Sequence, residues 1–298
     1  MAFDLTTQPP SSSSFILSYP AQHVLLVTIN RENAMNSVPT QAHWDADAIF
    51  TWFDHEPSLR VAIITGAGGK AFCAGQDLIE QAEFKAGPPP MSKRRHPPSG
   101  FCGISRRTGK KPILAAVNGF ALGGGFEICL NWLDPAYSLN VIVANVDGSD
   151  IVVASPKAQF GLPEAGVGIY AAAGGLPRVV RNCGLQIGSE IALTGRRLTA
   201  QEALAFHLIN KVSQTPESVV EETVELALKI ASLSPDSVIV TRHGLREAWE
   251  TGSVEWATQR TSERYDRLIF EGENAKIGIQ VRPFLLIQEA MGFEALLR

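Results

Sequence analysis

Two glutamates are the residues best suited by type and position to move protons. Glu127 follows a run of three glycines at the predicted start of a helix, and Glu164 follows Pro163 just beyond a predicted strand. Two carboxylates can perform acid and base catalysis without a metal, when one activates water and the other delivers a proton to carbon. A glutamate in a first helical turn also simply favours the helix dipole, and one in a loop is usually solvated. The two residues alone therefore leave the catalytic and the structural interpretation open.

Two glycine-rich segments, each just after a predicted buried strand, could bind a developing negative charge. In residues 71–78, small side chains let the backbone approach a ligand, and in residues 121–127 three glycines lead into a helix. The first amides of a helix have no internal partner and lie at its positive end, so they could stabilise a thioester carbonyl oxygen that becomes an enolate. One such donor contributes about 2.7–4 kcal/mol in the transition state, and a second amide must come from elsewhere. The glycine spacing fits neither a P-loop nor a dinucleotide-binding fingerprint.

Composition narrows the classes of partner. The chain has 298 residues, 45% of them hydrophobic, and a net charge of −4, which gives no reason to expect nucleic acid or a membrane as partner. A basic cluster at residues 93–96 is predicted to be a solvated loop, with a phosphate contact as the functional alternative. The cysteines, Cys73, Cys102, Cys129 and Cys183, form no C-x-x-C pair, so no metal site is predicted. Scattered cysteines and the lack of a secretory signal indicate an intracellular protein.

The predicted elements alternate between strands and helices and would position these residues in an α/β core. Residues 1–14 are predicted to be a disordered leader, and the proline-rich loop at 87–103 to be mobile. The predicted strands are 15–19 and 24–29, joined as a hairpin, followed by 61–65, 112–117, 151–154 and 209–212. The predicted helices are 39–53, 171–180, 186–193 and 199–205, and the chain is mostly helical beyond about residue 216.

Four segments together resemble the enoyl-CoA hydratase/isomerase family, also called the crotonase family. Residues 30–36 resemble its N-R-P-x-x-x-N segment, with Glu32 in place of proline, and residues 71–78 resemble A-F-C-A-G-A-D-L, with Gln76 in place of alanine. Residues 116–127 match almost residue for residue, and 160–164 resemble F-G-x-P-E. The resemblance extends from about residue 15 to about residue 280.

The resemblance implies a fold, an activity and an assembly. The fold is a crotonase-like spiral of ββα turns over residues 15–212 with a helical region over 213–298, usually assembled as trimers or hexamers. The activity is addition or removal of water across the double bond of an enoyl-CoA thioester. An enoyl-CoA isomerase and a catalytically silent binding protein are the alternatives. Some family isomerases carry an acid about eight residues beyond Glu164, where this chain has Ala172.

The resemblance also assigns roles to residues. The oxyanion amides fall on Gln76 and Gly124, Glu127 would activate water at the β-carbon, and Glu164 would exchange the α-proton. No separate cofactor is implied, because coenzyme A is part of the acyl-CoA substrate. The backbone that would hold the coenzyme A portion comprises Ala34, Met35, Ala74, Gln76, Asp77 and Leu78.

Two segments depart from the family pattern. Residues 132–148 have no counterpart, and Ser149 stands where the family has a cysteine. We hypothesise that this atypical insertion is a translated intron, the alternative being a genuine loop. The tail from Val281 also departs, and Leu296-Leu297-Arg298 is not a peroxisomal tripeptide. The compartment, whether cytoplasmic, peroxisomal or mitochondrial, is therefore left open.

Overall fold

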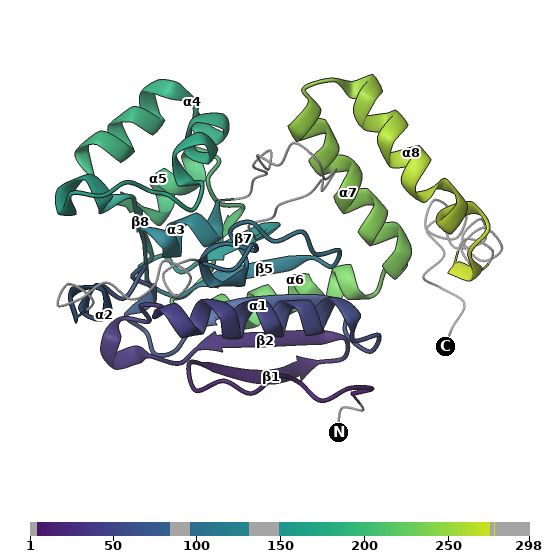
Figure 1. Cartoon of the computed structure of the whole chain (residues 1–298), viewed down its shortest axis with the longest axis horizontal. Coiled ribbons are helices and arrows are strands. Elements are labelled where there is room, and N and C mark those ends of the chain that lie inside the picture. The colour runs from purple at the N-terminus through teal and green to yellow at the C-terminus, as the bar shows by residue number, and fades with distance from the viewer. Residues whose placement is uncertain (1–4, 84–95, 131–148, 275–276, 278–298) are drawn as a thin grey trace. The chain divides into compact units, whose positions relative to one another are not determined.

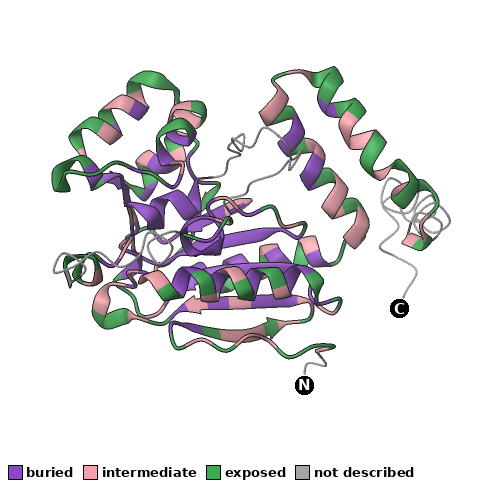
Figure 2. Cartoon of the chain, viewed as in Figure 1, coloured by how far each residue is buried: buried purple, intermediate pink, exposed green. Residues whose placement is uncertain are grey.

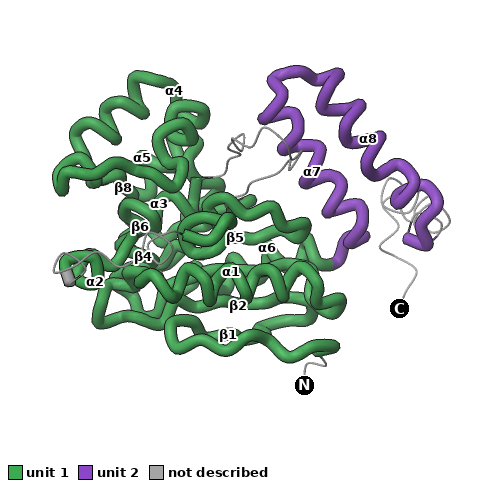
Figure 3. Tube along the Cα trace, viewed as in Figure 1, with its two compact units in different colours: residues 1–231 green, residues 232–298 purple. Residues whose placement is uncertain are grey.

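The computed structural model describes residues 5–83, 96–130, 149–274 and 277 (Figure 1). It divides into two compact units, residues 1–231 and 232–298 (Figure 3). The first unit holds every residue predicted to act in catalysis or coenzyme A binding.

A six-stranded sheet forms the centre of the first unit. Its strand order is β1-β2-β3-β5-β7-β10, antiparallel between β1 and β2 and parallel at every other pair. The predicted hairpin is confirmed, with its turn at Gln22 and His23. The strand bounds are β1 Phe15–Ala21, β2 Val24–Ile29, β3 Val61–Gly66, β5 Ile113–Val117, β7 Ile151–Ala154 and β10 Lys211–Val212.

Helices cover both faces of this sheet, which is why its inner strands are apolar throughout. Ala62 and Ile64 belong to one hydrophobic cluster with the buried face of α1 (Thr40–His55). Val61 and Ile63, which point the other way, belong to a second cluster with α6 (Val219–Ala231). Alternate residues of one strand thus enter two cores, as expected for a parallel sheet buried on both sides. Figure 2 shows this burial through the strands and the inward side of α1.

Short strands form a second sheet of order β4-β6-β8-β9. Its members are β4 Ala71–Cys73, β6 Phe120–Leu122, β8 Gln159–Gly161 and β9 Leu198–Thr199. Strand β3 is followed by β4, β5 by β6 and β7 by β8, so the chain steps from one sheet to the other in each successive turn. Because β4, β6 and β8 run parallel, the repeated step winds into the predicted spiral of strand pairs.

The remaining helices of the first unit are α2 Leu78–Glu83, α3 Gly124–Cys129, α4 Gly175–Thr194 and α5 Ala200–Ala205. The capping box predicted at Thr199 and Glu202 is confirmed at the start of α5. The two helices predicted over 171–193 form one element, α4, interrupted where Gly184 adopts φ 83°. The described part of the unit also contains the short 3-10 helices η1 Glu32–Ala34, η4 Phe101–Gly103 and η5 Pro163–Val167.

Two predicted boundaries differ from the structure. Residues 5–14 belong to the predicted disordered leader, yet the Thr6 and Thr7 amides donate to Glu56 at 3.0 and 2.8 Å. Glu56 is fully buried and needs these donors, so it fixes this segment in place. The predicted division at residue 213 moves to Ala231, because α6 packs on the sheet and belongs to the first unit.

The second unit contains α7 (Pro235–Thr251) and α8 (Val254–Phe270) packed against each other. Gly252, with φ 61°, ends α7, and the hydroxyl of Ser253 caps α8 by accepting from the Trp256 amide at 3.3 Å. Arg260 of α8 pairs with Glu247 of α7 at 3.2 Å. In the described part of the chain, no helix has the length and hydrophobicity needed to cross a bilayer.

Candidate active site

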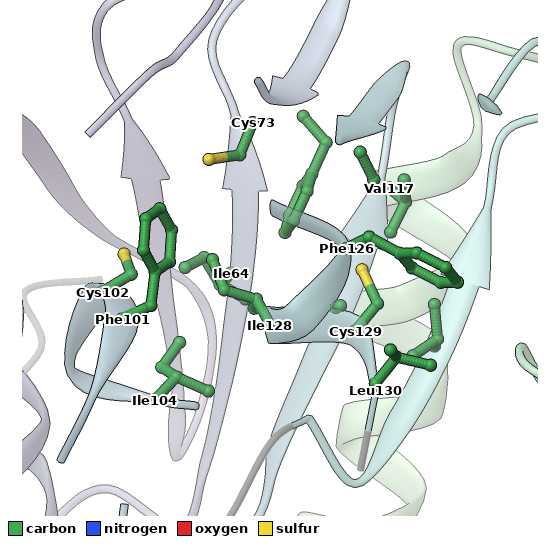
Figure 4. Close-up of a cluster of buried hydrophobic side chains, with 14 of the residues drawn as sticks. Ile64, Cys73, Phe101, Cys102, Ile104, Val117, Phe126, Ile128, Cys129 and Leu130 are labelled. Atoms are coloured by element: carbon green, nitrogen blue, oxygen red, sulfur yellow. The ribbon is translucent and has the colours of Figure 1, made fainter. Parts of the chain in front are cut away.

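Close packing fixes the turn that leads from β6 into α3. Gly123 adopts φ 55° and ψ −126°, and its amide donates to the Gly161 carbonyl at 2.9 Å. A Cβ atom at Gly124 would lie 2.5 Å from the Phe101 ring, and one at Gly125 would lie 2.0 Å from the Cys73 carbonyl oxygen. Both positions therefore require glycine. Figure 4 shows the apolar side chains of α3 packed among those of the neighbouring strands and η4.

The two predicted oxyanion amides lie on adjacent segments. A Cβ atom at Gly75, the residue before Gln76, would lie 3.3 Å from the Gly124 nitrogen. Val38 forms a parallel bridge with Gln76, in which it donates to the Gly75 carbonyl and accepts from the Asp77 amide. In such a bridge the Gln76 amide points away from Val38. Across the described ranges, neither the Gln76 nor the Gly124 amide donates a hydrogen bond, so both are available to an oxygen of a ligand.

Glu127 projects from the first turn of α3 into the interior. It is 3% exposed, and its Oε1 accepts from the Gly175 amide at 2.7 Å. Burial raises the pKa of Glu127 to about 7, and the negative charge of Glu164 acts in the same direction. The Gly175 hydrogen bond and the charge of Arg178 oppose that shift without cancelling it. Glu127 can therefore gain or lose a proton near neutral pH.

Glu164 lies in η5, the 3-10 helix that follows β8, where Pro163 occupies the first position. Burial raises the pKa of Glu164. Its Oε2 is buried and has no hydrogen-bond partner among the described residues, while its Oε1 lies 3.1 Å from the position a Gly123 Cβ would take. The glycine turn therefore also makes room for the second carboxylate.

The structure thus brings together two carboxylates and two backbone amides that are separated in the sequence. The negative charge of Glu164 contributes to the raised pKa of Glu127, so the two carboxylates are close enough to interact electrostatically. The arrangement suits a reaction in which negative charge develops on an oxygen while protons move to and from the substrate.

The residues predicted to hold coenzyme A form one continuous strip of backbone. The Ala74 amide donates to the Met35 carbonyl at 3.0 Å, and Ala34 ends the short helix η1 beside it. Leu78 is 49% exposed at the start of α2. The Asp77 side chain has a local role, because it pairs with Arg31 at 2.8 Å and caps α2 through the Ile79 and Glu80 amides.

Sequence analysis missed two buried side chains beside this site. His43, on the buried face of α1, donates from Nε2 to the Gln76 side chain at 2.8 Å. Arg178 of α4 is fully buried and donates to the carbonyls of Glu127 and Ala173 at 3.3 and 3.1 Å. The sequence signal that could have found them is a single histidine or arginine on a helix face that is otherwise apolar.

The ends of the atypical insertion lie close together. The Ser149 amide donates to the Ile128 carbonyl at 3.0 Å, and the Leu130 amide donates to Phe126 at 3.0 Å. Residues 132–148 themselves lie outside the described residues, as do residues 93–95 of the basic cluster and the tail from Val281. The Glu127 carboxylate, on the helix that precedes the insertion, is held by the Gly175 amide at 2.7 Å.

Among the described residues, no three histidine, cysteine, aspartate or glutamate side chains are grouped to hold a metal ion. The absence of a metal from the mechanism remains a prediction.

Comparison with known proteins identifies the family. The model of the enoyl-CoA hydratase/isomerase family matches residues 24–261, and the chain belongs to this family. Over 280 residues it is 42% identical to mevalonyl-coenzyme A hydratase of Beauveria bassiana, covering 92% of this chain and 94% of that protein. It is also 35% identical to carnitinyl-CoA dehydratase of Proteus mirabilis over 228 residues, covering 76% and 78% of the two chains.

Solved structures give the same family. The crystal structure of a probable enoyl-CoA hydratase/isomerase from Mycobacterium abscessus superposes with a TM-score of 0.73 and 34% identity. That alignment covers 91% of this chain and 95% of the other. The crotonase fold predicted from the sequence is therefore confirmed.

Proposed function

We propose that this protein is an acyl-CoA hydratase or dehydratase that adds water to, or removes it from, the carbon–carbon double bond next to a thioester. The observation that carries the proposal is the pairing of Glu127 and Glu164 beside the Gln76 and Gly124 amides. Neither amide has a partner among the described residues, and both carboxylates are buried.

The two amides would stabilise the enolate. When water adds to the β-carbon, electrons move onto the thioester carbonyl oxygen, and its negative charge needs donors already in place. Gln76 and Gly124 supply backbone N–H groups whose positions are set by the Val38 bridge and by the packing of Phe101. Donors fixed before the reaction need no reorganisation as charge develops, which makes them effective in the transition state.

The glutamates would transfer the protons. In dehydration, ionised Glu164 removes the α-proton, and protonated Glu127 gives its proton to the hydroxyl that leaves the β-carbon as water. In hydration the same steps run in reverse, so Glu127 takes a proton from water and Glu164 gives one to the α-carbon. Glu127 is the more buried of the two, at 3% against 9% exposed, which favours the proton on Glu127 and so the state that begins dehydration.

The relatives suggest the acyl group. A mevalonyl-coenzyme A hydratase is 42% identical over 92% of this chain, so we propose that the substrate is a short, branched acyl-CoA that bears a second hydroxyl at its far end. The predicted assembly into trimers or hexamers remains an expectation from the family and can be checked by light scattering of the purified protein.

Replacing each acid by its amide tests the reaction. In Glu127→Gln and Glu164→Gln, hydration of the enoyl-CoA should fall about 100- to 10,000-fold, because each change removes one proton carrier while keeping its shape. Water addition is measured by loss of enoyl thioester absorbance and by mass spectrometry of the product. Full activity in both variants would refute the proposal.

The same assay separates the alternatives. Migration of the double bond with no gain of water would indicate an isomerase, and binding of acyl-CoA without turnover would indicate a silent binding protein. At the position where some family isomerases carry an acid, Ala172 offers only a backbone carbonyl, which accepts from Arg106 at 2.9 Å.

A further inference from the structure

The Gln76 side chain lies in a polar cluster at the edge of the oxyanion site. We define this cluster as His43, Gln76 and His96. His43 and His96 both contact the Gln76 Oε1 atom, at 2.8 and 3.2 Å. The family segment that residues 71–78 resemble has alanine at this position, so the cluster depends on the glutamine that replaces it here.

A backbone hydrogen bond fixes the orientation of the Gln76 amide. The Cys102 amide donates to His43 Nδ1 at 3.0 Å, so Nδ1 must carry a lone pair and the proton of His43 must be on Nε2. Burial lowers the pKa of His43 to about 3, which keeps this ring neutral. Because Nε2 donates, its partner on Gln76 must be the carbonyl oxygen and not the NH2 group.

This assignment leaves the Gln76 NH2 group as a donor. Within the described ranges, no hydrogen bond from Gln76 Nε2 is seen, and the residue is only partly buried. Its oxygen is held by His43, a residue that is itself fully buried on α1. Among the described residues, the NH2 group therefore has no hydrogen-bond acceptor, and its direction is fixed by the contact of the Gln76 oxygen with His43.

The polar cluster adjoins the reacting atoms. The His43 ring packs edge-on against Phe101, with centroids 4.6 Å apart, and His96 approaches the same ring at 5.8 Å. The Phe101 ring also packs on Gly124, one of the two proposed oxyanion residues, where an added Cβ would lie 2.5 Å from the ring. An acyl group whose carbonyl oxygen is bound at Gln76 and Gly124 would thus have an apolar ring and one amide donor close by.

From these contacts we infer that the Gln76 side chain is a specificity-determining group, whose NH2 donates a hydrogen bond to an oxygen on the acyl portion of the substrate. This inference rests on the proposed function, since it assumes an acyl-CoA ligand. His43 acts as a positioning residue that orients the amide. A site built around a fixed donor disfavours an acyl group that lacks the oxygen, because the bound acyl group would then cover the donor without accepting its hydrogen bond.

Binding of unreactive thioesters tests this inference separately from catalysis. The probes are 5-hydroxy-3-methylpentanoyl-CoA and 3-methylpentanoyl-CoA, which differ only in the hydroxyl and have no double bond to hydrate. Their dissociation constants are measured by calorimetry for the wild type, Gln76→Met and His43→Phe. Gln41→Met is the matched control, because Gln41 is an exposed glutamine on α1 that bonds only to Asp45 at 2.9 Å.

The wild type should bind the hydroxylated probe about tenfold more tightly, as expected for one good hydrogen bond. Gln76→Met should reduce this ratio to about one, and His43→Phe should lower it in the same direction, whereas Gln41→Met should retain it. An equal ratio in wild type and Gln76→Met would overturn the inference. If His43→Phe does not fold, the partly exposed Gln76 variant still decides the question. Loss of hydratase activity has no bearing on this ratio, so the two proposals can fail separately.

Discussion

The two turns that carry the proposed oxyanion amides are held in different ways. Between β6 and α3, the backbone is fixed by close packing against Phe101 and Cys73, which leaves no space for a side chain at Gly124 or Gly125. After β4, the backbone is fixed by two hydrogen bonds with Val38, one donated and one accepted by it. These bonds do not involve the side chain at position 76, so its type can change without moving the backbone. The first turn can thus hold the geometry that the reaction needs, while the second can also contribute to the choice of substrate.

The largest effect should come from adding a methyl group to the glycine turn. In Gly125→Ala, the new Cβ would lie 2.0 Å from the Cys73 carbonyl oxygen, so the start of α3 must shift together with Glu127 and the Gly124 amide. We expect kcat/KM to fall about 100-fold or more, since a displacement of about 1 Å has effects of this size. Gly69→Ala is the control, because no atom lies within 4 Å of its added Cβ. Activity within a few-fold of wild type in Gly125→Ala would show that the turn is not sterically fixed.

The pH dependence of kcat/KM should report the protonation state of Glu127, the proposed acid beside this turn. Dehydration requires protonated Glu127, whose pKa is raised to about 7, so kcat/KM should fall about tenfold per pH unit well above that value. Glu127→Gln should lose this limb as well as most activity. Persistence of the limb in Glu127→Gln would assign it to another group.

The raised pKa of Glu127 also makes the stability of the protein depend on pH. The folded state binds the Glu127 proton more tightly than the unfolded chain, whose ordinary glutamate value is 4.5. The contribution of Glu127 to the free energy of unfolding is therefore full below pH 4.5 and is lost as the pH rises through about 7.

The smallest effect should come from removing residues 132–148. After this deletion Ser149 would follow Ile128 by four positions, which is the spacing of the helical hydrogen bond that their backbone atoms already form at 3.0 Å. We expect kcat/KM to stay within about twofold of the parent and the soluble yield to rise, because the described partners of Glu127, Gly175 and Arg178, lie outside the deleted segment. Deleting 132–149 instead should impair the protein, since it removes the Ser149 hydrogen bond. If the shorter deletion abolished activity, the insertion would be an integral part of the site.

Prediction from the sequence was most successful for long elements and for features set by residues close together in the chain, such as a helix cap. The uninterrupted apolar strands β3 and β5 and the capping box of α5 agree with the patterns that predicted them. The strands β4, β6 and β8 are missing from the predicted elements, because three residues do not show a periodic pattern. The leader was predicted to be disordered from its composition alone, which gave no sign that Glu56 needs the Thr6 and Thr7 amides.

The family, the crotonase-like spiral and the candidate residues for the amides and the acids could all be predicted before folding was considered, because they depend on the identity and order of residues in four short motifs. Only the tertiary structure decided the environment of each group. Burial raises the pKa of Glu127, the Cys102 amide sets the tautomer of His43, and that tautomer orients the Gln76 side chain. Such properties arise from residues far apart in the chain, since desolvation and hydrogen bonding depend on what folding brings together.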